Sequence, residues 1–366
     1  MRNAKTLPII LFTLFFAAAC SSDAPAPDDP DAQAGTPDAG ESSPDGSQAQ
    51  TDAPVQNSDT PIADCLSAMF VNPEAAVGPD YDQFNVTVGS HCVGTNHQDI
   101  TGIERVVFLG DSVTVGTPPT LARDFYRSVV ADGLVARFGL AEPNTLWKNA
   151  DPLNGTSVIQ DSGDFSSCAE WGARTDDFVQ QINDCFPANQ LGKRTLVVMT
   201  MGGNDIAAIA KDGLNNVPIE TLMTDAEAFV GLMRDAIEWF YTPGRFPNGV
   251  YVVFANVYEY TDGTAELGSC PGAALAGFDG EWAEPQALID LMLWVNEQYM
   301  AIAADTGSDM LFLQETFCGH GFNAEEPTAA CYRGPGNDNW FDATCIHPDP
   351  VGHQSLADMF LAIIDE

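Results

Sequence analysis

Positive charge is scarce in this sequence. Its 366 residues contain 14 Lys and Arg against 52 Asp and Glu, which gives a formal net charge of −38. An acidic surface of this kind repels nucleic-acid phosphates and anionic lipid head groups. We therefore expect no nucleic-acid partner and no polybasic surface that binds anionic membranes.

Several binding motifs are also absent from the sequence. It has no C-x-x-C pair and no G-x-x-x-x-G-K-[ST] segment, and it contains only five histidines. These absences argue against a zinc ribbon, a thioredoxin-type redox site and a phosphate-binding loop. We expect neither a metal nor an organic cofactor.

The N-terminus has the pattern of an export signal. Arg2 and Lys5 precede an apolar run, Leu7 to Phe16, that is too short to span a bilayer of about 30 Å. The segment that ends in Ala17-Ala18-Ala19-Cys20 resembles the lipobox of bacterial lipoproteins, although Ala17 stands where Leu is usual. We expect residues 1–20 to be a lipoprotein signal peptide with Cys20 lipidated. The alternative is ordinary cleavage that leaves Cys20 as a free thiol.

The number of cysteines supports this interpretation. Without Cys20, eight of the nine cysteines remain, enough for four disulfides in an oxidising compartment. The short separations favour Cys65–Cys92 and Cys168–Cys185. The pairing of the other four stays open: Cys270, Cys318, Cys331 and Cys345.

Two regions follow the signal. Residues 21–60 contain nine acidic residues, no basic ones and no aromatics, a composition typical of a disordered tether. Residues 61–366 carry the apolar patterns of a folded domain, in which residues 61–102 form an N-terminal extension without an assigned role. The tether and a lipid at Cys20 predict a location in the cell envelope. There the domain would face the periplasm or the exterior, anchored to the outer membrane, or it would be secreted.

The folded domain alternates strand and helix patterns. Apolar runs at 105–109, 195–201, 250–257 and 310–313 read as buried strands, and helical stripes occur near 121–134, 221–240, 285–304 and 350–364. This alternation predicts an α/β fold with a parallel sheet between helices. Ligands of such sheets bind beyond the carboxyl ends of the strands.

Polar residues cluster at those ends. Gly110-Asp111-Ser112-Val113 follows the first strand, and Gly202-Gly203-Asn204-Asp205 follows the second. A third group, His347-Pro348-Asp349-Pro350-Val351-Gly352, precedes the last helix. Each group alone is also a common helix-capping turn.

Together, in this order, the groups resemble the SGNH (GDSL-type) hydrolase family over residues 103–366. The resemblance implies a three-layer, flavodoxin-like α/β/α sandwich with a mainly parallel five-stranded sheet. It implies Ser112 as nucleophile, His347 as general base, and Asn204 with the Gly172 backbone as oxyanion donors.

The sequence departs from the family at one position. The family usually has Asp three residues before the catalytic His, and here Thr344 stands there. We expect the Thr344 backbone carbonyl to orient His347, with Asp342 as the alternative.

The resemblance implies an esterase or lipase, and the net charge of −38 favours a neutral acyl ester or lipid as its substrate. We expect the protein to be a monomer. A carbohydrate O-acetyl esterase is one alternative, and a non-catalytic binding protein that retains the fold is another. The stretches 258–284 and 314–345 are expected to wall the cleft.

Overall fold

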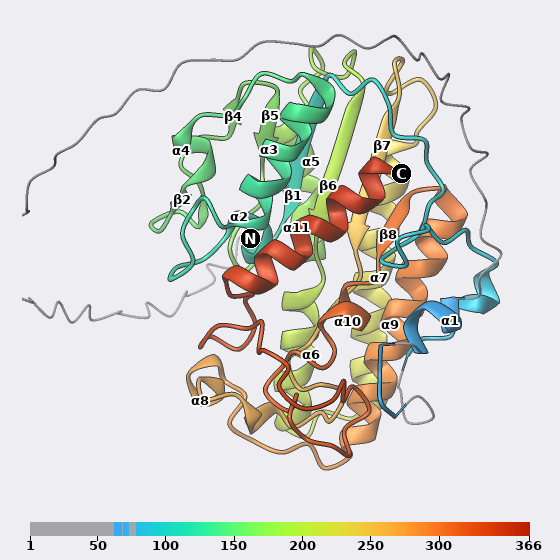
Figure 1. Ribbon diagram of the computed structural model, residues 1–366, viewed down its shortest axis with the longest axis vertical. Coiled ribbons are helices and arrows are strands. Elements are labelled where there is room, and N and C mark those ends of the chain that lie inside the picture. Colours follow the sequence, from blue (N-terminus) through green and yellow to red (C-terminus); the bar gives the residue numbers. More distant parts are fainter. Residues whose placement is uncertain (1–61, 68, 73–77) are drawn as a thin grey trace, which may run out of the picture. The chain divides into compact units, whose positions relative to one another are not determined.

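The computed structural model describes residues 62–67, 69–72 and 78–366 (Figure 1). The predicted signal peptide, the lipidation site Cys20 and the tether lie outside these residues. Within them, no helix is both long enough and apolar enough to cross a bilayer.

A six-stranded sheet forms the centre of the domain, in the order β4-β5-β1-β6-β7-β8. The strands of the sheet and of a separate two-stranded hairpin are β1 (Arg105–Gly110), β2 (Ala150–Asp151), β3 (Thr156–Ser157), β4 (Asp161–Ser162), β5 (Phe165–Ser167), β6 (Thr195–Thr200), β7 (Val250–Ala255) and β8 (Asp309–Leu311). Five strands of the sheet run parallel, and β4 pairs antiparallel with β5 at one edge. In chain order the parallel strands are arranged 2-1-3-4-5, which is the flavodoxin-like order.

The α-helices are α1 (Ile62–Ser67), α2 (Ser112–Val115), α3 (Tyr126–Phe138), α4 (Thr145–Lys148), α5 (Phe178–Cys185), α6 (Gly203–Leu214), α7 (Ile219–Phe240), α8 (Ala273–Ala276), α9 (Pro285–Thr306), α10 (Leu313–Phe317) and α11 (Pro350–Asp365). Three short 3-10 helices are η1 (Tyr81–Phe84), η2 (Thr175–Asp177) and η3 (Leu267–Ser269). Helices α3 and α11 pack together over one face of the sheet, while α5, α7 and α9 cover the other (Figure 1).

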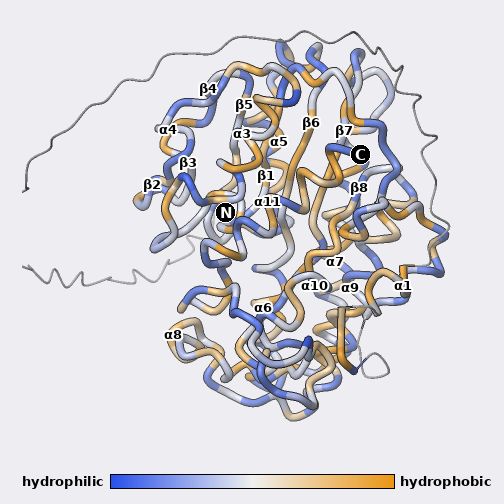
Figure 2. Tube along the Cα trace, viewed as in Figure 1, coloured by the Kyte–Doolittle hydropathy of each residue, from blue (hydrophilic) through white to orange (hydrophobic). Residues whose placement is uncertain are grey.

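The predicted α/β fold with a mainly parallel sheet is confirmed. Every residue of β1 and β6 is buried, because helices cover both faces of the sheet, and this explains why these strands are continuous apolar runs (Figure 2). The sheet has six strands where the family resemblance implied five, because the antiparallel β4 adds one at the edge of the five parallel strands. Strands β4 and β5 lacked a sequence signal because they are very short and rich in Ser.

Residues 93–95 of the N-terminal extension lie along the β8 edge of the sheet. The Thr95 N–H donates to the Met310 carbonyl at 3.0 Å, and the Phe312 N–H donates to the Val93 carbonyl at 2.9 Å. Gly94 forms an antiparallel bridge with Leu311. The extension therefore supplies the hydrogen-bond partners that an edge strand otherwise leaves open.

Four disulfides link the described residues. The predicted pairs Cys65–Cys92 and Cys168–Cys185 are confirmed, and the other two are Cys270–Cys345 and Cys318–Cys331. Such a set is typical of proteins that fold outside the reducing cytoplasm.

Candidate active site

The site lies beyond the carboxyl ends of β1 and β6, where the strand order reverses. Ser112 follows β1 directly and Asn204 follows β6, so the parallel register of these neighbouring strands places both residues at the same end of the sheet. This switch point is where ligands bind in open α/β sheets.

Ser112 is held at the first position of α2. The Asp111 carboxylate caps this helix by accepting a hydrogen bond from the Val113 N–H at 3.0 Å. Gly110 has a φ of 137°, and a Cβ there would lie 2.2 Å from the Thr200 carbonyl oxygen. Glycine is therefore required for β1 to turn into α2 this close to β6.

Asn204 lies in the first turn of α6 and joins the loop after β5 to the site. Its side-chain amide donates to the Ala173 carbonyl at 2.9 Å, and the neighbouring Asp205 carboxylate accepts from the Thr175 N–H at 3.2 Å. Gly172, just before Ala173, is exposed and has a φ of 77°. In the described part of the chain, no acceptor is bound to the Gly172 N–H. The second amide hydrogen of Asn204 and this N–H remain available as donors.

His347 comes from outside the sheet, in a tight loop just before α11. The Asp342 N–H donates to the His347 carbonyl at 2.9 Å, which closes the loop, and Cys345 within it is bonded to Cys270. The Tyr258 hydroxyl, at the end of β7, donates to the Ile346 carbonyl at 2.7 Å. These contacts fix the backbone of the loop that carries His347.

Pro350 and Gly352 of the same motif serve α11 and its packing. Asp349 caps the helix by accepting from the Gly352 N–H at 2.8 Å, and Pro350 stands in the first turn. A Cβ at Gly352 would lie 2.5 Å from the Trp340 carbonyl oxygen. The Asp349 carboxylate thus serves the start of α11.

The structure brings Ser112 and His347 together across 235 positions of sequence: the Ser112 Oγ lies 2.8 Å from the His347 Nε2. On the other side of the ring, the His347 Nδ1 lies 2.7 Å from the Thr344 Oγ1. Thr344 thus contacts His347 through its hydroxyl. This differs from the expected backbone carbonyl, because the turn that starts at Asp342 presents the side chain of Thr344 to the ring. Asp342 contacts Thr344 rather than the ring.

Burial sets the charge state of the site. It lowers the pKa of His347 below the usual 6.5, and the nearby Asp342 carboxylate partly opposes this shift. Burial also raises the pKa of Asp111 to about 7 and that of Asp205 to about 6. His347 is therefore largely neutral at pH 7, as a general base must be.

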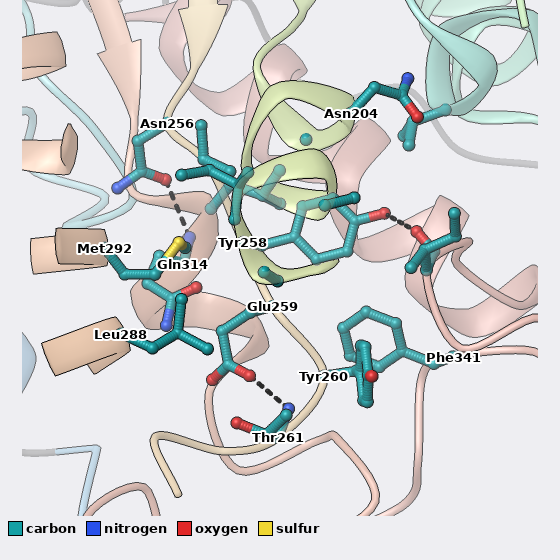
Figure 3. Close-up of a pocket in the computed structure, with 18 of the residues that line it drawn as sticks. Asn204, Asn256, Tyr258, Glu259, Tyr260, Thr261, Leu288, Met292, Gln314 and Phe341 are labelled. Carbon is teal, nitrogen blue, oxygen red and sulfur yellow. Dashed lines mark hydrogen bonds between the residues drawn. The ribbon is translucent and has the colours of Figure 1, made fainter. Parts of the chain in front are cut away.

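A mostly apolar cleft opens from Ser112 and Asn204 (Figure 3). The empty space in and in front of it, open solvent included, is about 1140 Å³. The walls come from α6, from α9 and from the two predicted loop stretches, and include Ile206, Ala210, Tyr260, Phe278, Leu288, Met292 and Phe341. Figure 3 shows Asn204, Tyr258 and Phe341 around the same space.

Two groups of the site were not predicted from the sequence, the Tyr258 side chain and the Thr344 hydroxyl. Tyr258 stands three positions beyond the end of β7, and the rule that ligands bind beyond the carboxyl ends of parallel strands was the signal available for it.

Among the described residues, no group of three His, Cys, Asp or Glu side chains is placed to hold a metal ion. The catalytic roles of Ser112, His347, Asn204 and Gly172 stay predictions.

Comparison with known proteins gives distant structural likeness only. No family model and no curated sequence matches the chain. An extracellular lipase from Streptomyces rimosus is 19% identical with a TM-score of 0.41, over 72% of this chain and 98% of that one. A lipase, Lip_vut3, from a goat rumen metagenome is 12% identical with a TM-score of 0.48, over 71% and 97%. A member of the lipolytic protein G-D-S-L family from Veillonella parvula is 16% identical with a TM-score of 0.42, over 72% and 99%.

Proposed function

We propose that this protein is a serine hydrolase of carboxylic esters, with Ser112 as nucleophile and His347 as general base. The observation that carries the proposal is the 2.8 Å contact between the Ser112 Oγ and the His347 Nε2, within hydrogen-bonding reach for proton transfer. Ser112 lines an apolar cleft together with Asn204, whose side-chain amide has a second hydrogen free to donate.

The reaction follows from these positions. His347 takes the Ser112 hydroxyl proton while the Ser112 Oγ attacks the ester carbonyl carbon. The negative charge moves to the carbonyl oxygen, where the Asn204 amide and the Gly172 N–H stabilise it. His347 then protonates the leaving alcohol, and water attacks the acyl-enzyme to release the acid.

The substrate class that fits best is a neutral ester with an apolar acyl chain. The cleft walls offer apolar side chains along most of their length, and the net charge of −38 disfavours anionic substrates. A sugar ester needs several polar partners in the cleft. The Asn256 amide, one polar group there, is already bonded to Tyr81 and Glu315.

Hydrolysis of p-nitrophenyl esters from acetate to laurate tests the proposal, with acetylated xylan as the sugar substrate. Wild type should hydrolyse the chromogenic esters and be labelled by a fluorophosphonate probe, and Ser112→Ala should do neither while keeping the same melting temperature. Unlabelled, inactive wild type would favour the non-catalytic binding protein. Activity on acetylated xylan alone would favour the carbohydrate esterase.

A pair of variants on α6 tests whether the acyl chain occupies the cleft. Ala207 lines the cleft and its neighbour Ala208 does not. Ala207→Phe should shift the preferred ester toward shorter chains, and Ala208→Phe should leave the preference unchanged. Equal chain-length profiles for both variants would exclude the cleft as the acyl site.

We also propose that the domain is anchored to the cell envelope, most simply to the outer membrane, through a lipid on Cys20. The four disulfides support an extracytoplasmic location. In a bacterial host, full-length protein should sediment with membranes and Cys20→Ala should not. Equal distribution of the two would refute the anchor.

A further inference from the structure

The Thr344 hydroxyl stands between a carboxylate and the imidazole of His347. The Thr344 Oγ1 lies 2.7 Å from the His347 Nδ1 and 2.5 Å from the Asp342 Oδ1. The Thr344 N–H also donates to the same carboxylate oxygen, at 2.7 Å. The Asp342 carboxylate, the Thr344 hydroxyl and the His347 ring thus form one continuous hydrogen-bonded line that ends at Ser112.

The direction of every hydrogen bond in this line follows from the chemistry of its members. An ionised carboxylate only accepts, so the single hydroxyl hydrogen of Thr344 points to Asp342. The Thr344 oxygen must then accept from His347, which places the ring hydrogen on Nδ1. The Nε2 is left bare and accepts from the Ser112 hydroxyl. This is the tautomer that general-base catalysis requires.

Asp342 is placed to act through this line. It is 8% exposed, and within the described residues its second carboxylate oxygen is buried without a hydrogen-bond partner. In the described part of the chain, no Lys or Arg forms an ion pair with it. Its charge is therefore not neutralised locally and polarises the Thr344 hydroxyl.

We propose that Thr344 is a positioning residue that couples the Asp342 carboxylate to His347, so that the catalytic array is Ser112–His347–Thr344–Asp342. This inference rests on the proposed hydrolase function. As the Ser112 proton moves to the His347 Nε2, positive charge develops on the ring, and the polarised Thr344 oxygen stabilises the Nδ1–H. No proton passes to Thr344 or to Asp342. In Ser-His-Asp enzymes a carboxylate bonded directly to the ring stabilises this charge, and here the carboxylate acts through the intervening Thr344 hydroxyl.

Four variants test this coupling on p-nitrophenyl butyrate. Thr344→Val removes the hydroxyl at constant shape, Thr344→Ala does so without added bulk, and Thr344→Ser retains it. Asp342→Asn removes the charge and keeps an oxygen that accepts. We expect Thr344→Val and Thr344→Ala to lower kcat by about ten- to hundredfold with little change in KM. Thr344→Ser should stay close to wild type.

The pH profile distinguishes electrostatic coupling of Asp342 to His347 from a merely structural role of Thr344. The titratable groups around His347 are Asp342 in its own loop, Tyr258, which is hydrogen-bonded to the Ile346 carbonyl, and His353 on α11. Asp111 stands next to Ser112 in the sequence. In Thr344→Val and in Asp342→Asn the acidic limb of kcat/KM should move to lower pH, since the imidazolium loses its stabilising partner. In the Thr344→Val background, Asp342→Asn should have little further effect, because the connection is already broken.

The outcomes are distinct. The coupling would be overturned if Thr344→Val kept the kcat and pH profile of wild type, or if Thr344→Ser lowered kcat as much as Thr344→Val. It would also be overturned if the effects of Thr344→Val and Asp342→Asn on kcat multiplied fully. An inactive wild type that resists the fluorophosphonate probe would instead overturn the hydrolase function itself.

Discussion

The disulfide Cys270–Cys345 ties the His347 loop to the segment that carries α8, and its removal should affect both stability and catalysis. The bond closes a loop with a sequence separation of 75 residues. In the chain-entropy treatment, a loop of this size corresponds to about 4.5 kcal/mol of folding free energy. The double variant Cys270→Ala/Cys345→Ala should lose a stabilisation of that order.

Catalysis should fall as well, because Cys345 lies two positions before His347. A shift of the imidazole by about 1 Å is enough to lower kcat by about a hundredfold. Because this displacement is confined to the catalytic loop, the fall in kcat should exceed the fall caused by the loss of folded protein alone.

The matched control is Cys65→Ala/Cys92→Ala, which removes a bond away from the site with a separation of 27 residues. Its stability loss should be about 3.5 kcal/mol, with kcat unchanged in the folded fraction. Urea unfolding and p-nitrophenyl ester kinetics at 20 °C measure the two quantities. Equal kcat in the two double variants would refute the idea that the bond holds His347 in place.

Three further predictions concern single groups. First, kcat/KM should rise with pH through a midpoint below 6.5, because burial lowers the pKa of His347 and the neutral ring is the base; a midpoint above 7 would contradict this. Second, Asn204→Ala should lower kcat by about 10²–10³-fold, and an unchanged kcat would remove Asn204 from the oxyanion site. Third, burial raises the pKa of Asp111 to about 7, so the carboxylate favours the folded state when protonated, and stability falls as the pH rises toward 7. Asp111→Asn keeps the helix cap, and its gain in melting temperature over wild type should grow from pH 4 to pH 8; a constant difference would argue that Asp111 does not titrate there.

The central strands could be predicted from sequence because burial on both faces leaves only apolar residues in them. The same logic failed for β5, whose residues Phe165–Ser167 include two serines and make up only three positions. The meeting of Ser112 and His347 was predicted from short motifs, whereas the pairing of Cys270 with Cys345 was not, because nothing local links residues 75 positions apart.

Thr344 contacts the His347 ring through its hydroxyl, whereas its backbone carbonyl was expected from the sequence. Both the carbonyl and the hydroxyl of Thr344 are acceptors, and the sequence does not contain the side-chain rotamer that chooses between them. That choice depends on the turn from Asp342, which is a product of the folded loop.

Each rim of the central sheet offers other chains little room to pair. On one side the short antiparallel β4 ends the ladder, and on the other the extension runs along β8 and is stapled by Cys65–Cys92. Within the described residues, a second molecule therefore finds only the two residues of β4 on one rim, and a partly paired β8 on the other, on which to add a strand. If the protein is anchored to a surface as we propose, short and covered rims limit strand exchange between neighbouring copies.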